Sequence, residues 1–99
     1  MGRKPKESPR RLAEKLLQIR NTLGLSQNEM RRRLELPEKF QQASISGYEL
    51  GTRIPPLTVL LAYAEVAGVY VDALIDDRLD LPTKLPAQPK SAGVRRKKS

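Results

Sequence analysis

Apolar residues recur at helical spacing near the start of the chain, separated by polar and charged ones. These apolar positions lie three or four residues apart, on one face of a helix: Leu12, Leu16, Ile19 and Leu23. Ser8 is a suitable N-cap, and Pro9 fits the first helical position, so we expect the helix to begin there. Gly24 is expected to follow its last turn in the left-handed conformation.

The middle of the chain predicts two short helices with a turn between them. Ser26 and Glu29 have the Ser-x-x-Glu spacing of a capping box, which starts a helix. The proline of segment 37–41 stops this helix, so we expect that segment to form a turn. A helix over residues 41–50 follows and ends at Gly51. Its inward side chains are Ile45 and Tyr48.

Two further helices complete the pattern. Pro56 is expected to open a helix that ends at Gly68, and residues 71–75 are expected to form a short fifth helix. The predicted apolar face of the first comprises Leu57, Leu60, Leu61 and Ala64. That of the second comprises Val71, Leu74 and Ile75. Since no useful stretch alternates as a strand does, the chain is predicted to be all-α.

The charge is unevenly distributed. The net charge is +8, of which residues 1–11 contribute five bases against one acid and residues 82–99 six bases against none. The segment between them carries eight bases and ten acids. We therefore predict a disordered basic arm over 1–7, a folded domain over 8–77 and a largely disordered tail, rich in Pro, Lys and Arg, over 78–99. Basic arms on a nearly neutral domain favour a polyanionic partner, or else simply keep the chain in solution.

Several classes of protein are excluded by what the 99 residues lack. Without Cys or His there is no thiolate or imidazole for a metal site or a catalytic triad. No apolar run approaches the roughly 18 residues of a membrane span. Asp76 and Asp77 have the pattern of charged surface at a helix end, so no enzyme activity, cofactor or metal is expected. A cytoplasmic protein is the simplest interpretation.

From Leu12 to Ile75 the sequence resembles the helix-turn-helix domain of the Cro/C1-type (Xre-like) repressor family. The resemblance is carried by Arg20, Leu23-Gly24-Leu25-Ser26-Gln27, Ile45-Ser46, Glu49, Gly51, Pro55, Leu60-Leu61-x-x-Ala64 and Ala67-Gly68-Val69. It implies a compact, five-helix, lambda-repressor-like domain that binds double-stranded DNA, commonly as a homodimer. It also implies transcription regulation, usually repression, by a protein associated with the bacterial nucleoid.

The resemblance also assigns roles to residues of the predicted 41–50 helix and its neighbours. Gln27 would donate to a phosphate and brace the recognition helix. Gln42 would pair with an adenine edge, since a carboxamide can bond N6 and N7 together. Ala43 and Ser46 would share the exposed face, with Ser44 nearer the DNA backbone.

Past that helix, Thr52 and Arg53 match the family's phosphate-contacting loop. Arg20 and Glu49 match a partly buried ion pair that ties the first helix to the recognition helix.

Three features depart from the family pattern. Arg31 stands where a small Ala is preferred between the two helices. The turn is about four residues longer (37–40), and Glu35 replaces the usual Gly; such a turn can separate the helices so that Arg31 points to a phosphate. Gly47 stands where a base-reading side chain is frequent, and it could permit close approach to the DNA backbone.

Two other functions remain open. An antitoxin or other protein-interaction module would bind its own operator and use tail 78–99 to engage a protein partner through Leu79, Leu81 and Leu85. Non-specific packaging of nucleic acid would depend on the arms alone.

Overall fold

Five α-helices and one short 3₁₀ turn make up the part of the chain that the computed structural model describes, residues 9–41 and 43–85. The helices are α1 (Leu12–Leu23), α2 (Gln27–Leu34), α3 (Ile45–Leu50), α4 (Leu57–Ala67) and α5 (Val71–Ile75), and the turn is η1 (Glu38–Phe40). No strand occurs in these two ranges, so the predicted all-α, five-helix fold is confirmed. Within them no helix has the length and apolar character needed to cross a membrane.

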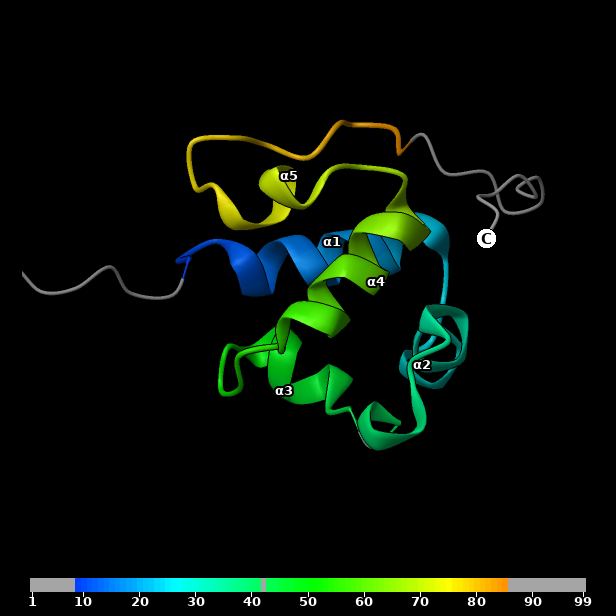
Figure 1. Cartoon of the computed structure of the whole chain (residues 1–99). Helices are drawn as coiled ribbons and strands as arrows, with labels where there is room; N and C mark the ends of the chain where they lie inside the picture. Colours follow the sequence, from blue (N-terminus) through cyan, green and yellow to red (C-terminus); the bar gives the residue numbers. More distant parts are fainter. Residues whose placement is uncertain (1–8, 42, 86–99) are drawn as a thin grey trace, which may run out of the picture.

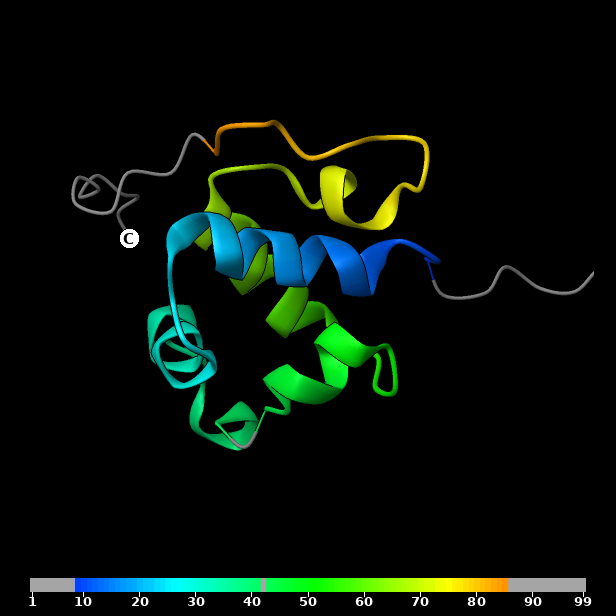
Figure 2. The same cartoon turned by 180° about the vertical axis from the view of Figure 1, so that it is seen from behind.

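Helix α1 lies at the centre of the arrangement, with α3 on one side and α5 on the opposite side (Figures 1 and 2). Helix α4 packs against α2 and α5, and α2 packs against α3. The core between them is aliphatic except for Tyr48 and Tyr63; its fully buried apolar members are Leu16, Ile19, Met30, Val59, Tyr63, Ala67 and Leu74. Burial of this apolar surface is the main force that holds such short helices in place.

The beginning of α2 agrees with the prediction. The Ser26 hydroxyl accepts a hydrogen bond from the Glu29 N–H at 3.0 Å, and the Glu29 carboxylate accepts one from the Ser26 N–H at 2.7 Å. The hydrogen bond from the Ser26 N–H, and after it the interaction with the Ser26 hydroxyl, lower the pKa of Glu29. The capping box is local, so it could be recognised from four adjacent residues.

The beginning of α1 differs from the prediction. The helix begins at Leu12 instead of Pro9, and no adjacent side chain caps it; Ser8 lies outside the described residues. The cap comes from the other end of the domain, because the Asp77 carboxylate accepts hydrogen bonds from the N–H groups of Arg10 (2.9 Å) and Arg11 (3.0 Å). A carboxylate at this end also complements the helix dipole.

The buried face of α4 also differs from the prediction. Leu57 and Leu61 are 81% and 50% exposed, while Val59 and Tyr63 are buried beside Leu60. Helix α4 is apolar almost all round, so spacing alone does not choose the face that packs against α2 and α5. The same limitation affects α5, in which Leu74 is buried but Ile75 is 41% exposed.

The chain after α5 runs back across that helix (orange in Figures 1 and 2). Leu81 and Leu85 are both buried in the common core. The Arg11 guanidinium binds this segment, donating to the carbonyls of Asp77 and Leu79 and to the Asp80 carboxylate. The packed part therefore extends past residue 77, where the sequence prediction ended the domain. The predicted arms, 1–7 and most of 78–99, lie outside the described residues.

Candidate nucleic-acid interface

The connection between α2 and α3 is long and partly ordered by its own turn. Helix α2 ends at Leu34, and Glu35 takes the left-handed conformation (φ 49°, ψ 51°) that glycine adopts more easily. Leu36 is buried, and η1 follows Pro37. The extra residues of the turn therefore form a 3₁₀ helix anchored by a leucine.

Helix α3 is shorter than predicted, since it begins at Ile45 and not at Gln41. The Ser44 hydroxyl accepts a hydrogen bond from the Gly47 N–H at 3.0 Å, which makes Ser44 the N-cap. Ala43 precedes the helix, where its N–H donates to the Phe40 carbonyl at 3.0 Å. The capping serine thus starts the helix four residues later than the apolar spacing suggested. Gln42 lies outside the described residues.

One side of α3 is fixed to the domain by apolar contacts and an ion pair. Ile45 and Tyr48 are buried, and Glu49 receives two hydrogen bonds from Arg20 of α1, Nε to Oε2 at 2.6 Å and Nη2 to Oε1 at 2.9 Å. The bond to Glu49 raises the pKa of Arg20. Arg20 also donates to the Leu25 carbonyl at 3.0 Å, at the start of the connection to α2. Arg20 therefore sets the position of α3 relative to both α1 and α2.

Gln27 connects α2 to α3 directly. Its Nε2 donates to Oε1 of Glu49 at 3.1 Å, the oxygen that Arg20 Nη2 also binds. The side chain is at the surface, so its remaining polar atoms stay available to a ligand. The bracing contact that the resemblance implied for Gln27 is thus made through Glu49.

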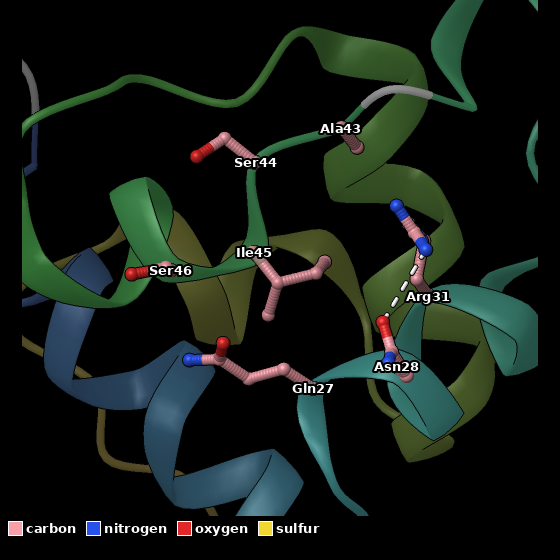
Figure 3. Close-up of a pocket in the computed structure, with 7 residues that line it drawn as sticks. All are labelled: Gln27, Asn28, Arg31, Ala43, Ser44, Ile45 and Ser46. Atoms are coloured by element: carbon pink, nitrogen blue, oxygen red, sulfur yellow. Dashed lines mark hydrogen bonds between the residues drawn. The ribbon is translucent and has the colours of Figure 1, made fainter.

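A surface hollow of about 210 Å³ lies between α2 and the start of α3 (Figure 3). It is lined by Gln27, Asn28, Arg31, Ala43, Ser44, Ile45 and Ser46. Arg31 is exposed there and donates to the Asn28 side-chain oxygen at 3.3 Å. Among the described residues that line it there is no carboxylate, and their one charged group is the cationic Arg31. A hollow of this kind suits an anionic ligand with hydrogen-bonding edges.

The hollow brings together five of the residues predicted to contact DNA: Gln27, Arg31, Ala43, Ser44 and Ser46. Arg31 causes no clash where the family prefers Ala, because it points to the surface while α2 and α3 remain in contact. Sequence reasoning missed Asn28. The sequence did contain a signal for this contact, because Asn28 lies three residues before Arg31 and side chains at that spacing are neighbours on a helix.

Thr52 and Arg53, which were also predicted to contact DNA, do not line the hollow; they follow the C-terminal end of α3. The N–H groups of both residues donate to the Gly47 carbonyl, at 3.0 and 3.2 Å, and the Thr52 hydroxyl donates to it at 3.3 Å. The loop therefore folds back on the last turn of α3. It brings Cγ and Cδ of the Arg53 side chain against the helix at Gly47.

Two helices joined by a turn, with the second fixed on one side and open on the other beside a cationic hollow, define a helix-turn-helix DNA-binding domain. The chain belongs to the Cro/C1-type helix-turn-helix family, HTH_3, whose model (Helix-turn-helix) matches residues 16–74. The match runs from the middle of α1 to Leu74 of α5, so it includes the whole site and excludes the segment after α5. No curated protein and no solved structure matches the chain.

Membership of this family makes the protein a DNA-binding regulator of the helix-turn-helix class, with double-stranded DNA as its partner. Within residues 9–41 and 43–85 no group of three or more His, Cys, Asp or Glu side chains is placed to hold a metal ion.

Proposed function

We propose that the protein is a transcriptional repressor that inserts α3 into the major groove of a specific operator. The observation that carries this proposal is the hollow between α2 and α3. Its lining combines hydrogen-bonding side chains of Gln27, Asn28 and two serines with the cation of Arg31. A phosphate beside the groove would fit against Arg31 and Gln27 while the outer side of α3 faces the bases. A protein bound in this way would block a promoter and so repress transcription. It would act in the cytoplasm, at the bacterial nucleoid.

We assign the base contacts expected of the start of the recognition helix to Gln42, Ala43 and Ser46, with Ser44 and Thr52 nearer the backbone. Ser44 uses its hydroxyl as the cap of α3, which leaves Ser46 as the freer hydroxyl. Because Gln42 is the longest hydrogen-bonding side chain of this group, it would contribute most to adenine recognition.

We further propose that the repressor acts as a homodimer. Four apolar side chains lie exposed between the last turn of α3 and the middle of α4: Leu50, Ile54, Leu57 and Leu61. Leu57 and Leu61 share one face of α4, since they are four residues apart. Covering them with a second copy would remove this apolar surface from water and place the two α3 helices side by side on one face of DNA.

The protein-interaction alternative has less support. Leu81 and Leu85, two of the three leucines assigned to a free partner-binding segment, are buried in the domain's own core. They are not free to engage another chain while the domain is folded.

The experiment that tests the proposal is selection of bound sites from random duplex DNA with the full chain. A repressor dimer should select a two-fold symmetric sequence, with an adenine whose contribution is lost in Gln42→Ala. Enrichment of no sequence would refute operator recognition. An unsymmetrical site, together with monomeric sedimentation, would refute the dimer alone.

A further inference from the structure

The space above Gly47 is occupied by two other side chains, those of Ser44 and Arg53. A Cβ atom built on Gly47 would lie 2.7 Å from the Ser44 hydroxyl oxygen and 3.0 Å from both Cγ and Cδ of Arg53. Gly47 is not among the glycines with positive φ, so the backbone conformation there would accept any residue. A side chain at position 47 would therefore have to displace the Ser44 hydroxyl and the Arg53 side chain, and glycine avoids this because it has no side chain.

Gly47 stands on the outward face of α3. Ile45, Tyr48 and Glu49 are turned toward the domain, which leaves Ser46, Gly47 and Leu50 on the opposite side of the helix. Ser46 and Leu50 are exposed, yet Gly47 is buried. Among the described residues outside the backbone of α3, the groups nearest to a Cβ at Gly47 are the Ser44 hydroxyl and the Arg53 side chain.

The backbone that carries the Arg53 side chain is fixed against the end of α3. The Arg53 N–H donates to the Gly47 carbonyl at 3.2 Å, and Thr52 donates to the same oxygen through its N–H and hydroxyl. The aliphatic part of Arg53 then lies along the outward face of α3. Within the described residues, no acceptor binds its guanidinium.

We infer that Arg53 replaces the side chain that position 47 lacks and reads a guanine edge in the major groove. This rests on the proposed operator binding and deepens it, because it moves Arg53 from a phosphate contact in the following loop to the reading face of α3. Apart from Leu50, which the proposed dimer would cover, the helix itself offers only one hydroxyl and one glycine on this face. A guanidinium lying over the glycine supplies the paired donors that fit guanine O6 and N7.

Arg53→Lys is the central variant, because it keeps the charge and the aliphatic stem but lacks the planar pair of donors. We expect it to bind the selected operator about tenfold more weakly or worse, corresponding to loss of a bidentate base contact. On duplexes of random sequence it should bind as the parent protein does. Arg78→Lys is the matched control, since Arg78 is an exposed arginine that follows α5, across α1 from α3.

Replacing single operator guanines with 7-deazaguanine identifies the base, because this analogue lacks the N7 acceptor. At one guanine the analogue should weaken binding of the parent protein but not of Arg53→Lys. Gly47→Ala should weaken preference for the same base pair, because the added methyl displaces the Arg53 stem as well as the Ser44 hydroxyl. Added to Arg53→Ala it should change that preference little further. Thermal unfolding of each variant checks that it is folded.

The results separate the two proposals. If the parent protein selects an operator, but Arg53→Lys matches it on that operator and no guanine responds to 7-deazaguanine selectively, then the assignment of Arg53 is overturned and operator recognition stands. If the selected operator contains no guanine, the assignment of Arg53 is likewise overturned and operator recognition stands. If the parent protein selects no sequence at all, both proposals fail.

Discussion

Arg20 and Glu49 form a two-point ion pair between α1 and α3, with heavy-atom distances of 2.6 and 2.9 Å. The Glu49 side chain is only 5% exposed, and it also accepts the bond from Gln27. One carboxylate therefore orders three elements: the central helix, the recognition helix and the helix that precedes it. This makes the direction in which α3 points depend on a charge that is largely withdrawn from water.

Arg20→Ala should lower the free energy of unfolding by about 3 kcal/mol, because it leaves a nearly buried carboxylate without its partner. Chemical denaturation measures this directly. Gln27→Ala is the control; it removes a more exposed bond to the same carboxylate and should cost less than about 1 kcal/mol. Equal losses in the two variants would show that the ion pair is not the main determinant.

Acid should weaken the domain through Asp77. Its pKa is lowered chiefly by the hydrogen bonds from the N–H groups of Arg10 and Arg11. A carboxylate with a depressed folded-state pKa contributes stability above its unfolded value near 4, and that contribution is lost as the pH falls through the folded value. Asp76, whose pKa is lowered to about 2 mainly by its hydrogen bond with Arg78, acts in the same window.

The thermal midpoint should therefore fall steadily between about pH 5 and pH 2. Asp77→Asn should be less stable than the parent protein at neutral pH and should lose less on acidification. If the two proteins show parallel pH profiles, the long-range cap contributes nothing measurable.

How much could be predicted from the sequence depended on the range of the interactions concerned. The α2 capping box and the buried positions Leu12, Leu16 and Ile19 of α1 depend on neighbours within four residues, and these were predicted correctly; Leu23 is only partly buried, and the buried Lys15 was not predicted. The beginning of α1 was predicted incorrectly, because the group that caps it, the Asp77 carboxylate, lies more than 60 residues away along the chain. The buried face of α4 was also predicted incorrectly, because the sequence of a helix that is apolar on nearly all sides does not indicate which side is buried.

The candidate site shows the same division. The resemblance assigned DNA contacts to Gln27, Ala43, Ser44 and Ser46, and Arg31 was expected there as a departure from the family pattern; all five line one hollow. The contact between Gly47 and Arg53 could not be anticipated, since it depends on how a loop folds back on a helix. Spacing along the chain contains no information about that fold.

Glu35→Gly should stabilise the domain by about 1 kcal/mol, because Glu35 is the one non-glycine residue with positive φ in the described part of the chain. Glu38→Gly is a matched control in the same connection; it lies in η1 and should be destabilising, by roughly 0.5 kcal/mol. Urea titration of both variants makes the comparison. A less stable Glu35→Gly protein would mean that the Glu35 side chain contributes more than its backbone costs.

Leu81→Ala should cost about 2–3 kcal/mol, because the side chain is buried in the core shared with α1 and α5. Leu79→Ala, two residues earlier and 42% exposed, should cost less than about 1 kcal/mol. Unfolding of the two variants under identical conditions tests whether the segment after α5 belongs to the folded unit. If both variants lost a similarly small amount of unfolding free energy, the segment after α5 would not belong to the folded unit.

The basic ends of the chain should contribute affinity without contributing sequence preference. Residues 1–8 contain three bases and residues 86–99 contain five. Removing both segments, while keeping the buried Leu85, should reduce the dependence of binding on salt, because each phosphate neutralised contributes about 0.9 to the slope of log K against log salt. Affinity should fall most at low salt, and the ranking of operator variants should be preserved. This result would separate a sequence-reading domain with electrostatic arms from a packaging protein, in which removing the arms would abolish binding to every duplex alike.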